Sequence, residues 1–210
     1  MKILFQGDSV TDAGRDRSNP HDLGEGYPKY AAAMLQDAFP DIDFEFVDLG
    51  IGGNRTEHLV QRLNDDFVAI QPDVVSIMIG INDVWHRMNG VETSDERFEA
   101  NYRLILDTVK SRTSAKIFII QPFLLEEASP DKAELREELN RKQAVISRLA
   151  AEYGDVYLPL DTVLHTQAEE APAYYTADGV HPTPDGACFI GEAYLNAIAP
   201  LIELLSKEAE

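Results

Sequence analysis

The chain has 210 residues, a net charge of −19 at pH 7 and one cysteine, Cys188. The charge argues against nucleic acid and membrane surfaces as partners, because both are bound through clusters of lysine and arginine. One cysteine excludes an internal disulfide, and the length suits one domain, which we place at residues 1–205 with a frayed acidic tail at 206–210.

Five short apolar runs predict β-strands, and in chain order they are Ile3–Phe5, Phe44–Val47, Val74–Ile79, Lys116–Ile120 and Val156–Leu158. Runs of this kind are typical of strands that helices cover on both faces. The first run is too short for the apolar core of a signal peptide, and no run approaches the ~18 residues of a membrane helix. We therefore expect a cytoplasmic protein.

Segments with helical periodicity separate these strands. Apolar residues recur at helical spacing over residues 59–70, 98–109, 130–153 and 184–201. Ser129 and Thr183 each precede a proline, which is the pattern of an N-cap followed by proline in the first turn. The alternation predicts an α/β fold: a three-layer α/β/α sandwich around a flavodoxin-like, five-stranded parallel sheet in the order 2-1-3-4-5.

Polar segments follow the strands at the points where each strand ends. They are Gly7-Asp8-Ser9, Gly50–Asn54 and Gly80–Asp83, and Asp178–His181 precedes the last helix. Ligands of open parallel sheets bind beyond the carboxyl ends of the strands, so we expect these segments to converge. The polar loop 14–26 is long for such a connection, and its role stays open.

Ser9 has two possible roles. Taken alone it is an N-cap, with Asp12 three residues later. In the company of His181 and Asp178 it is a nucleophile, because a serine hydroxyl needs a base within hydrogen-bond reach and that base needs a carboxylate to orient it. The backbone N–H groups of Ser9 and Gly53 and the amide of Asn82 would then bind the oxyanion, with Gly52 as an alternative to Gly53.

These blocks resemble the SGNH (GDSL-like) hydrolase family over the whole chain, although the first reads GDSV where the family has GDSL. The resemblance implies a serine esterase in which Ser9, Asp178 and His181 form the triad. The stretches SIMIGINDVW and GDSVTDAGR are similar to bacterial acetylxylan esterases of that family. This implies a small-molecule ester of an acetylated sugar as substrate and no cofactor. A thioesterase or lysophospholipase of the same family is the alternative.

Three further residues are candidates for substrate binding, namely Trp85, Tyr27 and His86, and Trp85 can equally be packing. We predict no metal, because the histidines lack the spacing of a zinc site. A nucleotide site is disfavoured because the first turn lacks G-x-G-x-x-G. A flavodoxin-like binding domain without catalysis is the competing class, and it would not react with an organophosphate.

Overall fold

The computed structural model describes residues 1–208 and contains one parallel sheet in the order β2-β1-β3-β4-β5. The strands are β1 (Lys2–Gly7), β2 (Glu45–Asp48), β3 (Val74–Met78), β4 (Lys116–Ile120) and β5 (Val156–Leu158). Every neighbouring pair is parallel. The predicted strands, strand order and fold class are confirmed.

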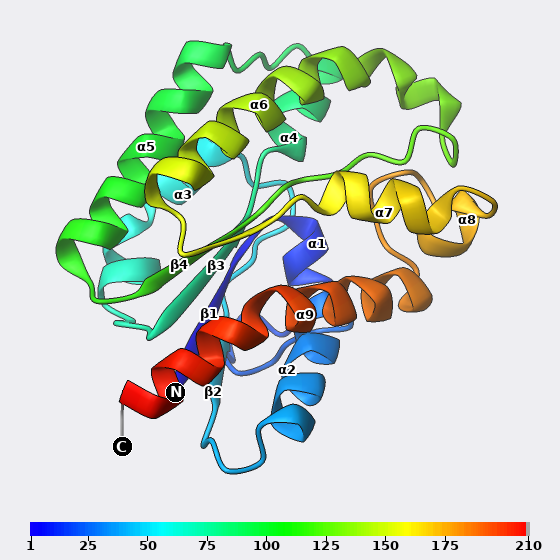
Figure 1. The fold of residues 1–210 in the computed structure, drawn as a ribbon. Helices are drawn as coiled ribbons and strands as arrows, with labels where there is room; N and C mark the ends of the chain where they lie inside the picture. The colour runs from blue at the N-terminus through cyan, green and yellow to red at the C-terminus, as the bar shows by residue number, and fades with distance from the viewer. Residues whose placement is uncertain (209–210) are drawn as a thin grey trace.

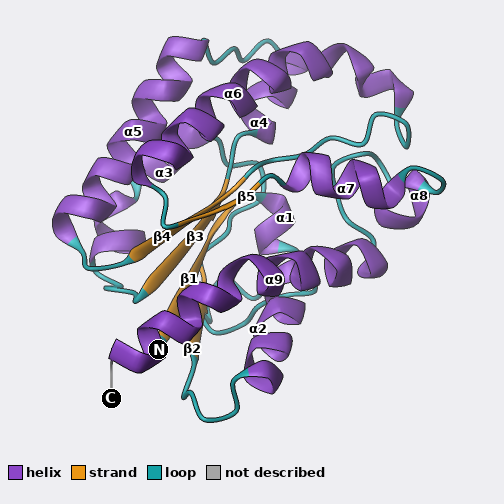
Figure 2. Cartoon of the chain, viewed as in Figure 1, coloured by secondary structure: helices purple, strands orange, loops and turns teal. Residues whose placement is uncertain are grey.

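Helices form a layer on each face of the sheet (Figures 1 and 2). One layer contains α2 (Tyr27–Ala38) and α9 (Pro184–Glu208). The other contains α3 (Thr56–Gln61), α5 (Asp95–Arg112) and α6 (Arg136–Tyr153). Shorter helices follow the carboxyl ends of β1, β3 and β5, namely α1 (Ser9–Asp12), α4 (Ile81–Trp85) and α7 (Leu160–Ala168), and α8 (Pro172–Tyr175) comes after α7.

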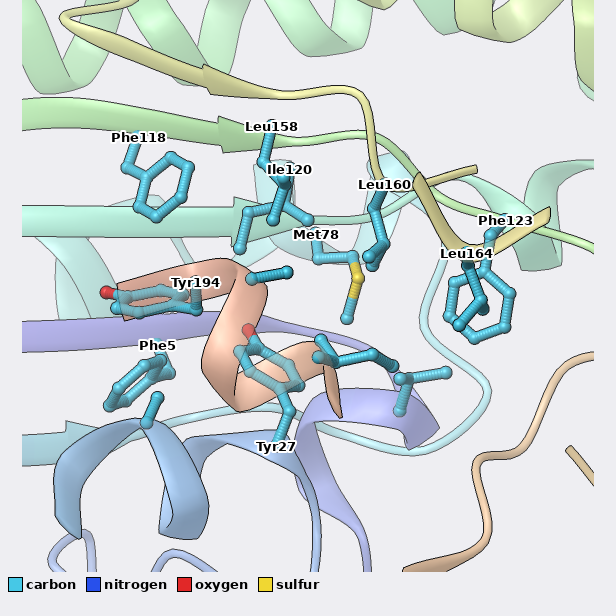
Figure 3. Packing of buried hydrophobic residues seen from close by; sticks show 14 of the residues in the cluster. Phe5, Tyr27, Met78, Phe118, Ile120, Phe123, Leu158, Leu160, Leu164 and Tyr194 are labelled. Atoms are coloured by element: carbon cyan, nitrogen blue, oxygen red, sulfur yellow. The ribbon is translucent and has the colours of Figure 1, made fainter. Parts of the chain in front are cut away.

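Alternation along the strands creates two cores. Ile3 and Phe5 of β1 face α2 and α9, whereas Leu4 between them faces the other layer. Figure 3 shows the first core, where Phe5, Phe118 and Tyr194 pack together. Burial on both faces is the reason that the strands read as continuous apolar runs.

Two predicted helices differ in their detail. Residues 59–70 are divided between α3 and a π-helical turn, η1 (Asn64–Val68). The segment beginning at Pro130 starts as a 3₁₀ helix, η3 (Pro130–Leu135), before α6. The hydroxyl of Ser129 does not cap it but donates to Asp131 Oδ1 at 2.5 Å. Neither change alters which face of the sheet these segments cover.

Helix α9 is long and apolar enough to cross a membrane by length and composition. It nevertheless packs along α2, with Ile190, Tyr194, Ile198 and Ile202 buried in the first core. Thr183 caps it as predicted, because its Oγ1 accepts a hydrogen bond from the N–H of Gly186 at 3.1 Å. The helix reaches Glu208, so residues 206–208 of the expected frayed tail are helical, and residues 209–210 lie outside the described residues.

Candidate active site

Ser9 is the first residue of α1, directly after β1. The N-cap of α1 is Asp8, whose Oδ1 accepts a hydrogen bond from the N–H of Val10 at 3.1 Å. The interpretation of Ser9 as an N-cap is therefore wrong. Its hydroxyl is instead 2.9 Å from Nε2 of His181. As the first helical residue, Ser9 also has a backbone N–H without an intrahelical acceptor.

His181 lies in a loop that fixes the direction of its ring. Asp178 Oδ2 is 2.9 Å from His181 Nδ1, and Asp178 Oδ1 accepts hydrogen bonds from the N–H groups of Val180 and His181. Burial alone would raise the pKa of Asp178, but these hydrogen bonds hold it below its usual value. A carboxylate that stays ionised can hold a proton on Nδ1 and leave Nε2 free to accept one.

Gly53 is the third residue of a tight turn beside Ser9. The turn is closed by a hydrogen bond from Asn54 N–H to Ile51 O at 3.1 Å, and Gly53 has φ +81°. This position strains any residue with a Cβ, which explains the glycine. Gly52 N–H donates to Asp12 Oδ2 at 2.8 Å, so that group is already engaged. Of the two predicted candidates for an oxyanion donor, this leaves the N–H of Gly53.

Asn82 lies on α4 and is 5% exposed. Its Nδ2 donates to the carbonyl of Asn54 at 3.1 Å, which brings the amide beside the turn that contains Gly53. An asparagine amide has two N–H donors, so one remains for a ligand. Ser9, Gly53 and Asn82 thus lie in three strand-end segments that meet at one edge of the sheet.

Asp83 connects the segment after β3 to the segment after β2. Its carboxylate accepts from the N–H of Thr56 at 3.0 Å and from its hydroxyl at 2.7 Å. Burial raises the pKa of Asp83 to about 6, although the hydrogen bonds from Thr56 oppose the shift. This pair ties α4 to the start of α3, immediately after the Gly53 turn.

Two other carboxyl groups are buried at the same edge. Asp8 follows β1 and Asp48 ends β2, and the relative exposure of both is near zero. Burial raises the pKa of Asp8 to about 7 and that of Asp48 to about 7. Arg15 Nε lies 3.6 Å from Asp48 and partly compensates its charge.

The Gly52–Gly53 turn is also held by Asp12 and Arg15, to which the sequence alone assigns no such role. Asp12 binds the N–H of Gly52 and also forms an ion pair with Arg17. Arg15 donates from Nε to the carbonyl of Gly50 at 3.1 Å. These contacts give the polar loop 14–26 a role, because its first residues brace the connection after β2. This role is visible only in the folded chain, because the contacting residues are 35 and 40 positions apart in the sequence.

The three predicted substrate-binding residues have different positions. Trp85 lies at the site, with its ring centroid 5.6 Å from that of His181. Tyr27 is wrongly assigned, because it is fully buried in the first core against Phe5 and Tyr194 (Figure 3). His86 follows Trp85 and is half-buried, and burial together with neighbouring Arg55 lowers its pKa.

One group of potential metal ligands occurs among residues 1–208, namely Glu126, Glu127 and His165. It lies where α7 meets the connection after β4, not at Ser9. Arg136 forms an ion pair with Glu126 there, so its guanidinium already neutralises one of the three potential ligands.

Comparison with known proteins agrees with this geometry. Residues 5–187 match the model of the GDSL-like lipase/acylhydrolase family. An acetylxylan esterase of Geobacillus stearothermophilus is 31% identical over 207 residues, which cover 94% of this chain and 93% of that protein. A structure of that esterase, Axe2, has a TM-score of 0.84 at 30% identity and covers 93% of this chain and 92% of its own.

A second solved structure, described as a GDSL-like lipase from Parabacteroides merdae, has a TM-score of 0.90 at 30% identity, with 94% and 95% of the two chains covered. Two further Axe2 structures are of catalytic mutants in which a serine and a histidine are each replaced by alanine. The family match begins in β1 and ends in α9, and so takes in every strand and each segment that meets at Ser9. The chain therefore belongs to the GDSL-like lipase/acylhydrolase family and is a carboxylic ester hydrolase.

Proposed function

We propose that this hydrolase removes acetyl groups from carbohydrate esters such as acetylated xylo-oligosaccharides, through an acyl-enzyme on Ser9. The observation that carries the mechanism is the chain of two 2.9 Å hydrogen bonds from Ser9 through His181 to Asp178. The existence of catalytic serine and histidine mutants of the related esterase supports the same assignment.

The reaction follows from the positions of these groups. His181 Nε2 takes the Ser9 proton as Oγ attacks the ester carbonyl, and Asp178 stabilises the imidazolium that forms. The negative oxygen is bound by the N–H groups of Ser9 and Gly53 and by the Asn82 amide. His181 then protonates the leaving alcohol, and in the second half it activates the water that releases acetate from Ser9.

The acetyl part of the proposal is supported by the related acetylxylan esterase of Geobacillus stearothermophilus, which matches nearly the whole chain. The carbohydrate part of the proposal is supported by the related acetyl-xylooligosaccharide esterase from Geobacillus.

A series of esters tests this function. We expect p-nitrophenyl acetate to be hydrolysed faster than the butyrate and octanoate, and acetate to be released from acetylated xylo-oligosaccharides. Ser9→Ala should abolish turnover without lowering the melting temperature, since it removes one hydroxyl from a half-buried position.

Two results would contradict the proposal separately. Turnover retained by folded Ser9→Ala would exclude Ser9 as the nucleophile. A rate that rises from acetyl to octanoyl would leave the mechanism intact and favour a thioesterase or lysophospholipase, the alternative within the family.

A further inference from the structure

Lys132 is a buried lysine on η3 that contacts the loop carrying Asp178 and His181. It is 6% exposed, although lysine is rarely buried unless a charged partner compensates it. Lys142, the other buried lysine, has such a partner in Asp95 at 2.7 Å. No carboxylate among residues 1–208 forms a salt bridge with Lys132.

The ammonium group of Lys132 is instead held by three neutral groups. Nζ donates to the main-chain carbonyl of Asp178 at 2.8 Å and to Ser129 Oγ at 3.0 Å. It also lies 4.9 Å from the ring centroid of Trp85, within the range of a cation–π contact. Ser129 Oγ in turn donates a hydrogen bond to Asp131 Oδ1, so the nearest carboxylate in this chain of contacts is separated from Lys132 by one hydroxyl group.

Two of these partners are the supports of His181. Asp178 orients the imidazole through Nδ1, and Trp85 packs against the ring at 5.6 Å between centroids. Lys132 therefore joins the main chain of the aspartate to the side chain of the tryptophan, which lie on separate segments. A shift of either would move Nε2 away from Ser9.

The loop has one further anchor from the same connection after β4. Leu125 N–H donates to the carbonyl of Gly179 at 2.8 Å. Gly179 has φ +81°, and a Cβ there would lie 2.7 Å from the carbonyl oxygen of Leu125. Leu125 and Lys132 thus fix consecutive carbonyls of the loop, at residues 179 and 178.

We propose that Lys132 is a positioning residue for ester hydrolysis, which holds the Asp178–His181 loop and Trp85 so that His181 faces Ser9. The inference rests on the triad mechanism proposed above. Lys132 touches neither the reacting hydroxyl nor the imidazole, so it acts through Asp178 and Trp85. An apolar side chain of the same length would fill the same space without the free-energy cost of burying a charge. It would, however, leave the carbonyl of Asp178 without a hydrogen-bond donor.

Replacing Lys132 by methionine, which has similar length and no donor, tests the proposal. We expect kcat for p-nitrophenyl acetate to fall about 10-fold or more and KM to stay within about twofold, because small displacements of a catalytic group act on the chemical step. Inactivation by a serine-directed organophosphate should slow in parallel. Lys132→Arg, which keeps the charge and the donors on a bulkier head group, should lose less kcat than Lys132→Met.

Trp85 supplies an optical readout that is independent of turnover, because it is the only tryptophan of the chain. Its emission spectrum should change in Lys132→Met, since the cation over its ring is lost. Lys132→Gln, which retains a donor without the charge, is the second variant. It should show the same spectral change with a smaller loss of kcat.

Lys142→Met is the matched control, since Lys142 also donates to a carbonyl, that of Thr93 at 2.6 Å, and lies 5.3 Å from the ring centroid of Phe98. It should lower the melting temperature and leave the Trp85 emission and KM unchanged. The proposal is overturned if the Lys132 variants keep wild-type kcat. It is also overturned if Lys132→Met loses no more kcat than Lys142→Met does for the same loss of melting temperature. Activity in Ser9→Ala would instead refute the triad and leave the spectral result standing.

Discussion

At the scale of single residues, the site combines carboxyl groups in opposite environments. Asp178 is surrounded by N–H donors, which keep its pKa low, whereas Asp8 has lost its water and accepts one bond from Val10 N–H. Asp8 directly precedes Ser9 in the chain, and Asp178 is hydrogen-bonded to His181. One is suited to stabilise an imidazolium, and the other caps α1 and has a pKa of about 7.

Asp8→Asn should stabilise the protein at pH 8, and at pH 5 it should stabilise it less. The folded pKa of Asp8 is raised to about 7 from 3.8, so its contribution to stability is present at low pH and is lost as the pH rises between these values. The whole effect is at most roughly 4 kcal/mol. The asparagine Oδ1 can still accept from Val10 N–H.

Urea unfolding at both pH values measures this difference. Asp65→Asn, at an exposed position, is the control and should show the same stability as the wild type at each pH. Equal stabilisation by Asp8→Asn at pH 5 and pH 8 would show that loss of the buried charge is not the cause.

At the scale of elements, the candidate site residues lie in the connections after the strands, whereas the long helices supply side chains to the two cores. The segments after β1, β2 and β3 are joined to one another by side-chain hydrogen bonds: Asp12 to Gly52, Asn82 to Asn54 and Asp83 to Thr56. Ser9, Gly53 and Asn82 therefore occupy fixed positions, because the three short segments that contain them are hydrogen-bonded to one another.

Asp83→Asn should reduce kcat about 10-fold and change KM less, because one Thr56 donor would face an amide N–H and the Gly53 turn would move. Thr56→Ser keeps both donors to Asp83 and is expected to remain near wild-type activity. Steady-state kinetics with p-nitrophenyl acetate measures both variants. Equal losses in the two would assign the effect to packing of the Thr56 methyl group.

The sequence was sufficient to predict the elements whose signal is local. The strands are continuous apolar runs, and Ser9, Asp178 and His181 stand at their ends or in the loop before α9. Tyr27 was misplaced because an aromatic residue after a glycine-rich loop resembles a rim residue until its neighbours Phe5 and Tyr194 are known. The roles of Asp12, Arg15 and Lys132 depend on contacts between distant segments, which no spacing encodes.

At the scale of the whole molecule, acidity acts against stability at high pH. The net charge of −19 produces self-repulsion, and Asp8, Asp48 and Asp83 add buried charges as the pH rises through about 6 to 7. In the opposite direction, Asp95 and Glu99 have pKa values lowered by Lys142 and Arg103, and their contribution is lost in acid.

We therefore expect the melting temperature to be highest at acidic pH, about 4 to 5, and to fall toward pH 8, because the three buried acids lose stability from their unfolded pKa of 3.8 upward. At pH 8, salt near 0.15 M should raise it, because the Debye length is then about 8 Å and surface repulsion is screened. Circular dichroism from pH 4 to 9 at two ionic strengths checks both. A melting temperature that rises steadily to pH 8 would contradict the buried-acid explanation.

The two ends of the described chain lie together at the amino edge of the sheet, where Met1, Leu205 and Ser206 line a common cavity (Figure 1). Ser9, Gly53 and Asn82 lie at the opposite, carboxyl edge. A tether, a carrier particle or another protein module joined at either end would thus extend from the side away from Ser9, Gly53 and Asn82. The enzyme can be attached to a solid support through either end with Ser9 directed away from that support.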